Sequence, residues 1–341
     1  MKKLVVAAAM MLVAGSAFAS NFRAADQVYV PVAGHLAGGS GTFISDVFIS
    51  NVSTDPVTVT VIYVPFGAGP STPQNNFPPI NLAAGERKEF IDFFASALGL
   101  PTGFGQLIFN GCKQGSDCGP ATQDSFGVSP FFRPITVESR IFSIPTGTTL
   151  SQNPPTNGQD MPGMPWYSFV SSDSATVGLD KVFVTGLRNT GAVNQAGTYR
   201  GNLGLINASQ FSNTTLAVKL FNGSTGQQIG TTVTQGLAPL GNVQLQLGGS
   251  FPAFTGATAT NAYVTVEQIS STPTSDSPQT CGTSGCPAFF VYGSVLDNQS
   301  GDATTLEAQF LKPLTDAAIA CIFNPTSSCK ATTGFRRAVK H

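Results

Sequence analysis

Hydrophobic and polar residues alternate along several short stretches of the chain with the two-residue period of a β-strand. Residues 57–61 alternate valine with threonine, and residues 242–247 alternate polar with aliphatic side chains. Such alternation is typical of strands that bury one face. Turn residues such as Asp55-Pro56 and Asn222-Gly223 interrupt the chain roughly every ten residues. The pattern predicts an all-β fold of antiparallel strands, most simply a β-sandwich.

The chain also contains an internal repeat with an offset of about 155 residues. In each copy an apolar run ends in the sequence Asn-x-Ser, at Asn51 and again at Asn207. Other segments match in the same order: 82–85 with 237–241, 105–109 with 261–266, and 135–142 with 289–296. The preserved order predicts two homologous antiparallel β-sandwich domains in tandem.

Two stretches need separate interpretation. Residues 86–98 have the spacing of a short amphipathic helix, but their counterpart at 242–247 does not. We therefore predict a strand over 86–93 and only a helical turn over 94–98. Residues 289–292 are apolar on both faces, which is typical of a strand in the interior of a sandwich.

These observations set the expected domain limits. The first β-sandwich domain is expected over residues 20–145 and the second over 181–311, with a Pro-rich linker at 146–180 between them. The apolar stretch 164–169, which holds the only tryptophan, Trp166, could form an edge strand or fill a groove between the domains. A disulfide-clipped tail is expected over 312–341.

The N-terminal sequence predicts export. Two lysines, an apolar run and the small residues Ala17 and Ala19 resemble a secretory signal peptide over residues 1–19, cleaved after Ala19. The segment has the features of a bacterial signal peptide, so we expect the mature chain in the periplasm, at the cell surface or in the medium. No later stretch reaches about 18 uninterrupted apolar residues, so no transmembrane span is expected after signal removal.

Six cysteines support an oxidising compartment. They fall into three pairs that are close in sequence: Cys112 with Cys118, Cys281 with Cys286, and Cys321 with Cys329. Six cysteines allow fifteen connectivities, of which three local disulfides are the simplest. Zinc binding is disfavoured because no histidine lies near any pair, and a Cys-x-x-Cys redox motif is absent from the sequence.

Charged residues make up only 10% of the chain, against about a quarter in an average soluble protein. Without the predicted signal peptide, 15 basic residues face 18 acidic ones. A chain that is both nearly neutral and poor in charge lacks the basic surface that nucleic acids require, so no nucleic-acid partner is expected.

The repeat resembles a family of uncharacterised secreted bacterial proteins built from tandem β-sandwich modules. The resemblance rests on the opening segment 28–35, on the segment 45–53 with its copy at 201–209, and on the turn at 297–302. The first copy departs from the pattern at the position of that turn, where it has residues 143–148 instead. The resemblance implies the tandem sandwich fold and brings no catalytic residues.

Catalytic chemistry has few candidate residues, and we predict no catalytic site. His35 is the one histidine away from the C-terminus, and it lies in a Gly-rich stretch expected to be a solvated loop. A Gly-x-Ser-x-Gly motif is absent from the sequence. Paired carboxylates could support a hydrolase, the least favoured alternative. Those considered are Asp46, Glu86, Glu89, Asp92 and Glu138.

One turn could bind calcium. Asp297, Asn298 and Asp302 place oxygen ligands within a single tight turn, a donor type that calcium prefers. We favour an ordinary Asx-type turn that ends a strand. No other cofactor is expected.

The sequence thus predicts a non-enzymatic structural, adhesive or assembly module of the bacterial envelope or exterior. Its sheet edges could pair with further copies or with envelope proteins by strand addition. The alternative is an extracellular module that binds calcium or glycans, at the 297–302 turn and the His35 stretch.

Overall fold

The structure is a computed structural model that describes residues 24–38, 41–123, 129–168, 181–191, 195–277 and 286–310. Within these ranges the chain is almost entirely β-structure, and every pair of neighbouring strands is antiparallel. The predicted all-β class is confirmed. Among the described residues, no helix is long and apolar enough to cross a membrane. The predicted signal peptide, Cys281 and the tail with Cys321 and Cys329 lie outside the described residues.

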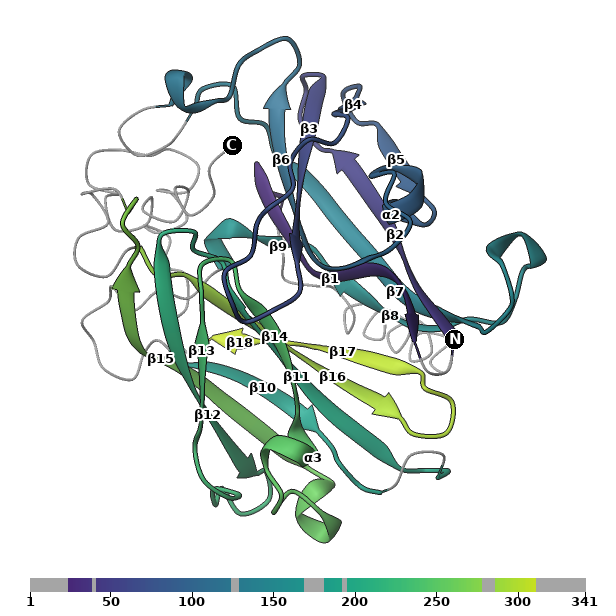
Figure 1. The fold of residues 1–341 in the computed structure, drawn as a ribbon, viewed down its shortest axis with the longest axis vertical. Coiled ribbons are helices and arrows are strands. Elements are labelled where there is room, and N and C mark those ends of the chain that lie inside the picture. Colours follow the sequence, from purple (N-terminus) through teal and green to yellow (C-terminus); the bar gives the residue numbers. More distant parts are fainter. Residues whose placement is uncertain are drawn as a thin grey trace, which may run out of the picture.

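The first half of the chain forms one large sheet (Figure 1). Its strands are β1 (Gln27–Gly38), β2 (Gly41–Asn51), β3 (Val57–Pro65), β4 (Ile80–Leu82), β5 (Arg87–Phe90), β6 (Gly103–Lys113), β7 (Ile135–Pro145), β8 (Asn157–Pro162) and β9 (Met164–Pro165). The order is β4-β3-β6-β1-β2-β7-β8, with β5 paired to β2 and β9 to β1. The short helix α2 (Phe93–Ser96) follows β5, so the strand and helical turn predicted over 86–98 are both present.

The second half forms two sheets. Its strands are β10 (Val182–Leu187), β11 (Tyr199–Asn207), β12 (Ser212–Asn222), β13 (Val233–Leu237), β14 (Asn242–Gln246), β15 (Ala262–Pro273), β16 (Phe289–Asp297), β17 (Ala303–Glu307) and β18 (Gln309–Phe310). One sheet has the order β13-β12-β15-β10-β18 and the other β14-β11-β16-β17. The short helix α3 (Leu247–Ser250) follows β14, as α2 follows β5.

The two halves share one strand order. In the first half, β4-β3-β6-β1-β9 corresponds to β13-β12-β15-β10-β18, and β5-β2-β7-β8 corresponds to β14-β11-β16-β17. Each opening strand also changes register once, between Val30 and Ala33 in β1 and between Thr185 and Leu187 in β10. The halves differ because the long β1 pairs with β2 and joins the two parts of the first half into one sheet.

The repeated Asn-x-Ser sequence has a structural reason. The Asn51 amide donates hydrogen bonds to the backbone oxygens of Asp55 at 2.8 Å and Ala83 at 2.9 Å. The Asn207 amide bonds in the same way to Ser212 at 2.7 Å and Ala238 at 2.9 Å. Each buried asparagine thus fixes the start of the next strand and the turn that follows the edge strand, because it satisfies carbonyl groups at both places.

The smaller sheet of the second half is buried on both faces. One face places Leu205 and Val291 in a core shared with β12 and β15. The opposite face places Ile206, Phe290 and Tyr292 in the core of the first half. A Cβ atom at Gly204 would lie 1.8 Å from the Tyr292 ring, so only glycine fits beside that side chain. The strand predicted to be apolar on both faces therefore lies at the boundary between the halves.

The stretch 146–180, predicted as a linker, contains two strands of the first sheet. β8 pairs with β7 and β9 pairs with β1, so the first set of nine strands ends at Pro165 and not at 145. Edge strands tolerate proline because their outer N–H groups need no partner within the sheet. Trp166 is buried, and its indole N–H donates to Asp26 at 3.0 Å. β8 also contacts β17, where Thr305 donates a hydrogen bond to the Asp160 backbone oxygen.

Candidate functional site

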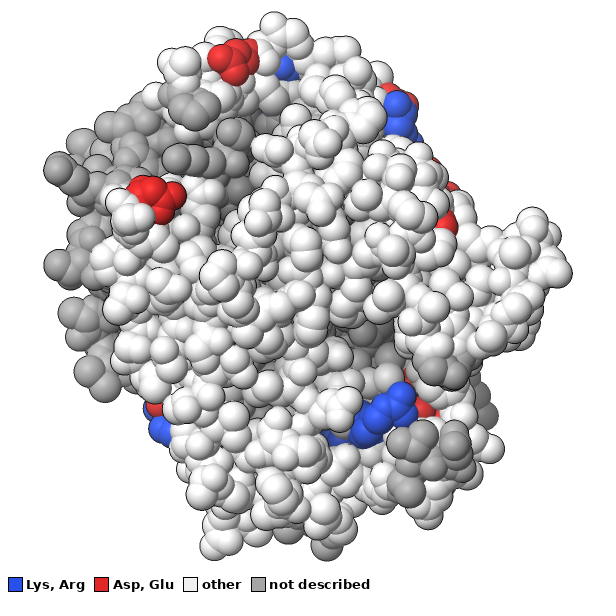
Figure 2. Space-filling view, in the orientation of Figure 1, with Lys and Arg blue, Asp and Glu red and all other residues white. Residues whose placement is uncertain are grey.

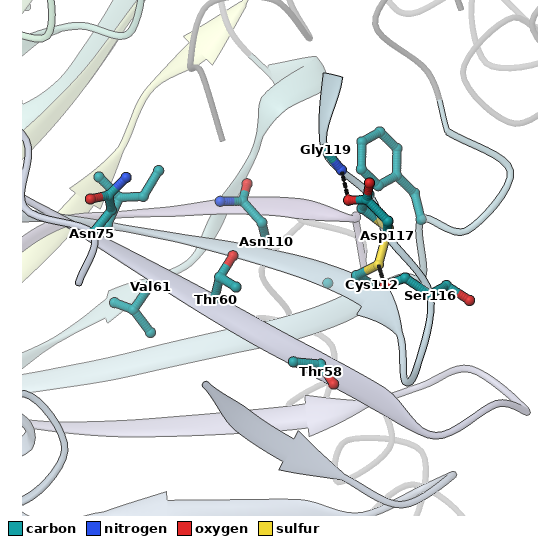
Figure 3. A pocket seen from close by; sticks show the side chains of 13 residues that line it. Thr58, Thr60, Val61, Asn75, Asn110, Cys112, Ser116, Asp117 and Gly119 are labelled. Atoms are coloured by element: carbon teal, nitrogen blue, oxygen red, sulfur yellow. Dashed lines mark hydrogen bonds between the residues drawn. A yellow bond between two sulfur atoms is a disulfide. The ribbon is translucent and has the colours of Figure 1, made fainter. Parts of the chain in front are cut away.

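A cavity of about 360 Å³ lies beside β3 and β6 (Figure 3). Thr58 and Thr60 of β3 line it together with Asn110 of β6. Asn75, from the segment between β3 and β4, and Asp117, from the loop after β6, complete its polar lining. Because successive residues of a strand point to opposite faces, Val57 and Val59 enter the core instead, whereas the buried Val61 also lines the cavity.

Asn110 is the most buried polar side chain of the cavity, with an exposed fraction of 4%. Its oxygen accepts a hydrogen bond from the Gln27 amide at 2.9 Å, and Gln27 in turn accepts one from the Tyr29 hydroxyl at 3.2 Å. Burial raises the pKa of Tyr29, so this hydroxyl stays protonated and remains a donor. The Asn110 amide nitrogen is buried and has no hydrogen-bond partner among the described residues.

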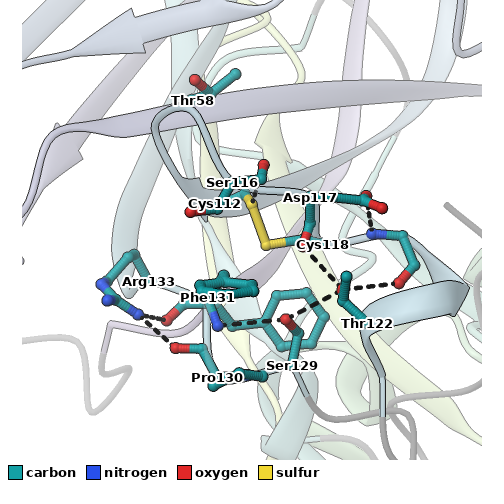
Figure 4. The surroundings of a disulfide bond; sticks show 12 residues. Thr58, Cys112, Ser116, Asp117, Cys118, Thr122, Ser129, Pro130, Phe131 and Arg133 are labelled. Atoms are coloured by element: carbon teal, nitrogen blue, oxygen red, sulfur yellow. Dashed lines mark hydrogen bonds between the residues drawn. A yellow bond between two sulfur atoms is a disulfide. The ribbon is translucent and has the colours of Figure 1, made fainter.

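The Cys112–Cys118 disulfide closes one side of the cavity (Figure 4). Within its loop, the Asp117 carboxylate accepts the Gly119 N–H at 2.7 Å, and the Thr122 hydroxyl donates to the Asp117 backbone oxygen at 2.8 Å. These bonds and the disulfide hold the loop against the end of β6. The structure thus contains the first predicted cysteine pair. Cys286 is also disulfide-bonded, to a partner that lies outside the described residues.

An ion-pair network holds the other side of this region. Asp55 accepts a hydrogen bond from Arg133 at 2.6 Å and lies 3.2 Å from the Lys113 ammonium. The hydrogen bond from Arg133, followed by that from Lys113, lowers the pKa of the Asp55 carboxyl. Lys113, the cation next to the disulfide loop, is therefore already paired.

His35 lies in β1 and not in a solvated loop. It pairs with Ile44 of β2 on one side and with Gly103 of β6 on the other, so His35 lies within the sheet. Its Nδ1 atom lies 2.9 Å from a carboxylate oxygen of Asp92, and both side chains are largely buried. Asp92 caps α2 in a left-handed conformation, with φ at 49°, and its N–H donates to Asp46 at 3.0 Å.

Among the carboxylates considered for a hydrolase, Asp46 lies on a face of the first sheet that the second half does not cover. Asp46 of β2 lies opposite Arg140 of β7, and burial raises the pKa of the Asp46 carboxyl. In the second half the equivalent cross-strand pair is Asn202 with Ser294. The sheet face that holds Asn202 and Ser294 packs against the first half, whereas the face that holds Asp46 and Arg140 does not pack against the second half. Glu89 and Glu138 are exposed on this side of the chain, whereas Asp46 is itself buried and accepts the Asp92 N–H.

The turn at 297–302 uses its oxygen atoms within the chain. One Asp297 carboxylate oxygen accepts the N–H groups of Gln299 at 2.9 Å and Ser300 at 2.7 Å, the geometry of an Asx-type turn. Asn298 is buried and accepts a hydrogen bond from Arg200 at 2.9 Å. Asp302 accepts the Gly158 N–H at 3.2 Å and so ties this turn to β8. Calcium binding here stays a prediction, and the described residues contain no cluster of three metal-ligating acidic, histidine or cysteine side chains.

Apart from Cys112 and Cys118, the described residues that line the cavity were not among the predicted site residues. Asn110 and Asn75 stand in no motif, and Thr58 and Thr60 have the pattern of an ordinary half-buried strand. The one sequence signal near the site was the short spacing of Cys112 and Cys118, which predicted a clipped loop without indicating what that loop covers.

No family model matches the sequence, and no curated protein matches it. One similar solved structure is Bacteroides uniformis beta-glucuronidase 2 covalently bound to cyclophellitol-6-carboxylate aziridine, with 11% identity, a TM-score of 0.15, and coverage of 82% of this chain and 25% of that one. Another is Bacteroides uniformis beta-glucuronidase, with 11% identity, a TM-score of 0.14 and the same coverage. The chain thus spans about a quarter of the length of these proteins. At such TM-scores the likeness carries no argument about function.

Proposed function

We propose that this chain is an exported, non-enzymatic structural module of the bacterial envelope or exterior, and that it assembles with copies of itself. The observation that carries the proposal is an open sheet edge at β13. This strand pairs with β12 on one side, and among the described residues no strand pairs with its other side. An unpaired edge presents backbone N–H and C=O groups to which another strand can bond.

The sequence of β13 leaves this edge unprotected. Residues Val233 to Leu237 contain neither a charged side chain nor a proline, the two common devices that keep edges apart. Thr234 and Gly236 are exposed. The Gly236 backbone oxygen accepts a hydrogen bond from the Gln235 side chain at 2.8 Å, which an incoming strand could replace.

The equivalent edge of the first half is shielded. β4 has only three residues, and the Lys88 ammonium donates to the Asn81 backbone oxygen at 2.7 Å. A charged side chain at an edge carbonyl opposes pairing with a second strand, because that strand would have to displace and desolvate it. Since the two halves share one strand order, the protection of β4 supports the idea that the exposure of β13 has a use.

The surface charge is compatible with self-association. Charged side chains are few on the face seen in Figure 2, and the chain without its predicted signal peptide has 15 basic and 18 acidic residues, a formal net charge of −3. A protein with little net charge experiences little long-range repulsion between copies. Two copies related by a two-fold axis could pair β13 with β13 in the antiparallel direction, which is a closed, self-complementary contact.

Light scattering on size-exclusion fractions of the mature chain tests this assembly. A variant with Thr234→Lys and Gly236→Lys places charges on the edge, and a Cβ atom at Gly236 meets nothing within 4 Å, so its fold should persist. The matched control carries Ser224→Lys and Gln227→Lys in the exposed turn before β13. We expect dimers for the wild type and the control and monomers for the edge variant. A monomeric wild type would contradict the proposal.

A further inference from the structure

The cavity beside the disulfide has features that self-association through β13 does not use. It lies in the first half, on the same face of β1, β3 and β6 that packs against β16 farther along. Its volume of about 360 Å³ falls within the range of small-molecule sites. Side chains from two strands and two loops converge on it, as Figure 3 shows for Thr60, Asn75, Asn110 and Asp117.

The buried Asn110 amide indicates that the cavity is a binding site. Its nitrogen points into the cavity in Figure 3, whereas its oxygen is held by Gln27. A buried donor without an acceptor destabilises the fold, because it has given up its hydrogen bonds to water. Such a donor contributes nothing favourable to folding, whereas a ligand oxygen in the cavity would accept its hydrogen bond.

The second half shows that the fold does not require this arrangement. The position of Asn110 on β6 corresponds to that of Glu267 on β15. Asn110 follows Phe109, which pairs with Val61 of β3, and Glu267 follows Val266, which pairs with Val218 of β12. Glu267 lies 3.3 Å from Lys181 and 2.9 Å from Lys219, so both of its carboxylate oxygens are paired. The first half has neutral amide and hydroxyl groups where the second half has a completed ion-pair cluster.

From these groups we propose that the cavity binds a neutral sugar residue through hydrogen bonds. No lysine or arginine is among the described residues that line it, and Asp117 would repel an anion. Sugar hydroxyls both donate and accept, which matches the amide donor of Asn110, the hydroxyl of Thr60 and the carboxylate of Asp117. Binding of this kind relies on hydrogen bonds instead of the aromatic platforms that a chain with one tryptophan can hardly supply.

Saturation-transfer NMR on the mature chain tests the proposal with a fixed panel. The panel holds glucose, galactose, N-acetylglucosamine and cellobiose, with glucuronic acid as the anionic comparison and triglycine as a peptide comparison. We expect at least one neutral sugar to bind with a dissociation constant in the millimolar range or below. Asn110→Ala and Thr60→Val should each weaken that sugar at least fivefold.

Thr60→Val keeps the test decisive if Asn110→Ala fails to fold, because Thr60 is exposed on a strand that valine suits. Thr215→Val on β12 is the matched control in the other half and should leave binding unchanged. The proposal is overturned if no neutral sugar binds, if glucuronic acid or triglycine binds more tightly, or if Thr60→Val and Thr215→Val have equal effects. Because β13 lies in the other half, each of these results is independent of self-association.

Discussion

The rings of Tyr29 and Phe290 meet edge to face across the boundary between the two halves, with centroids 6.1 Å apart and planes inclined by 75°. Both side chains are buried. Such a contact joins β1 of the first half to β16 of the second within one continuous core. Two halves that share a core in this way are expected to unfold together, although each has the strand order of a complete sandwich.

Phe290→Ala tests this coupling. The substitution should lower the free energy of unfolding by about 3–5 kcal/mol, because it removes a fully buried ring and leaves a cavity. Trp166, the only tryptophan, lies in the first half and reports on that half by fluorescence. We expect urea to unfold the wild type in one transition. Phe290→Ala, although it lies in the second half, should shift the Trp166 fluorescence transition to a lower urea concentration. A Trp166 transition that does not move would show that the halves are independent.

The two repeated asparagines should contribute equally to stability. Asn51→Ala and Asn207→Ala each leave buried backbone oxygens without their donors, which should cost about 1–3 kcal/mol in either half. Thermal unfolding followed by circular dichroism measures the loss. Asn76→Ala, at an exposed position, is the control and should change stability by less than about 0.5 kcal/mol. A large loss in one half only would argue against equivalent roles.

Much of the fold could be predicted because it depends on local patterns. Alternation identified β3 and β14, and the repeated Asn-x-Ser sequence located two turns that are built alike. β8 was missed because the prolines around it resemble a linker, and edge strands tolerate proline. β9 lies in the stretch 164–169, for which an edge strand was one of the two predicted outcomes. The layering of the halves could not be predicted, since apolar residues such as Phe290 and Tyr292 show that a face is buried without showing what covers it.

The Glu267 cluster predicts how stability depends on pH. The hydrogen bond from Lys219 lowers the pKa of the Glu267 carboxyl in the folded chain, although partial burial opposes it, and Lys181 adds to the lowering. Because the unfolded chain then binds the proton first, this contribution to stability is complete at neutral pH and is lost as the pH falls through the folded-state pKa. Glu267→Gln should therefore cost about 1 kcal/mol or less at pH 7.

Urea unfolding of the wild type and Glu267→Gln between pH 7 and pH 3 measures this contribution. The difference between the two proteins should shrink toward zero at the acid end of the range. A difference that stayed constant over the whole range would mean that packing of the side chain matters more than its charge.

The Cys112–Cys118 disulfide should add modestly to stability. It spans a sequence separation of 6, and a loop of that size removes about 2 kcal/mol of chain entropy from the unfolded state. The double variant Cys112→Ala and Cys118→Ala should lose that amount in urea unfolding while its far-ultraviolet circular dichroism stays unchanged. Substitution is preferable to a reducing agent, because a reductant would also open the disulfide of Cys286. A loss of most of the β signal would show that the loop is needed for folding.

The cavity was harder to predict than the fold because it depends on residues far apart in the chain. Asn110 becomes a candidate ligand donor only once Gln27 holds its oxygen and its nitrogen is left facing the cavity. Neither fact follows from the local sequence, which shows an asparagine near the end of an apolar strand. The carboxylates and His35 were more conspicuous, yet the structure pairs His35 with Asp92 and distributes the other carboxylates over buried and exposed positions.

Hydrogen–deuterium exchange of β13 at increasing protein concentration tests the assembly most directly. If the strand pairs with the same strand of a second copy, peptides covering residues 233–237 should exchange more slowly at high concentration. Peptides covering β4 should not change, because that edge is shielded. Exchange in β13 that is fast and independent of concentration, up to the solubility limit of the mature chain, would contradict assembly through this edge.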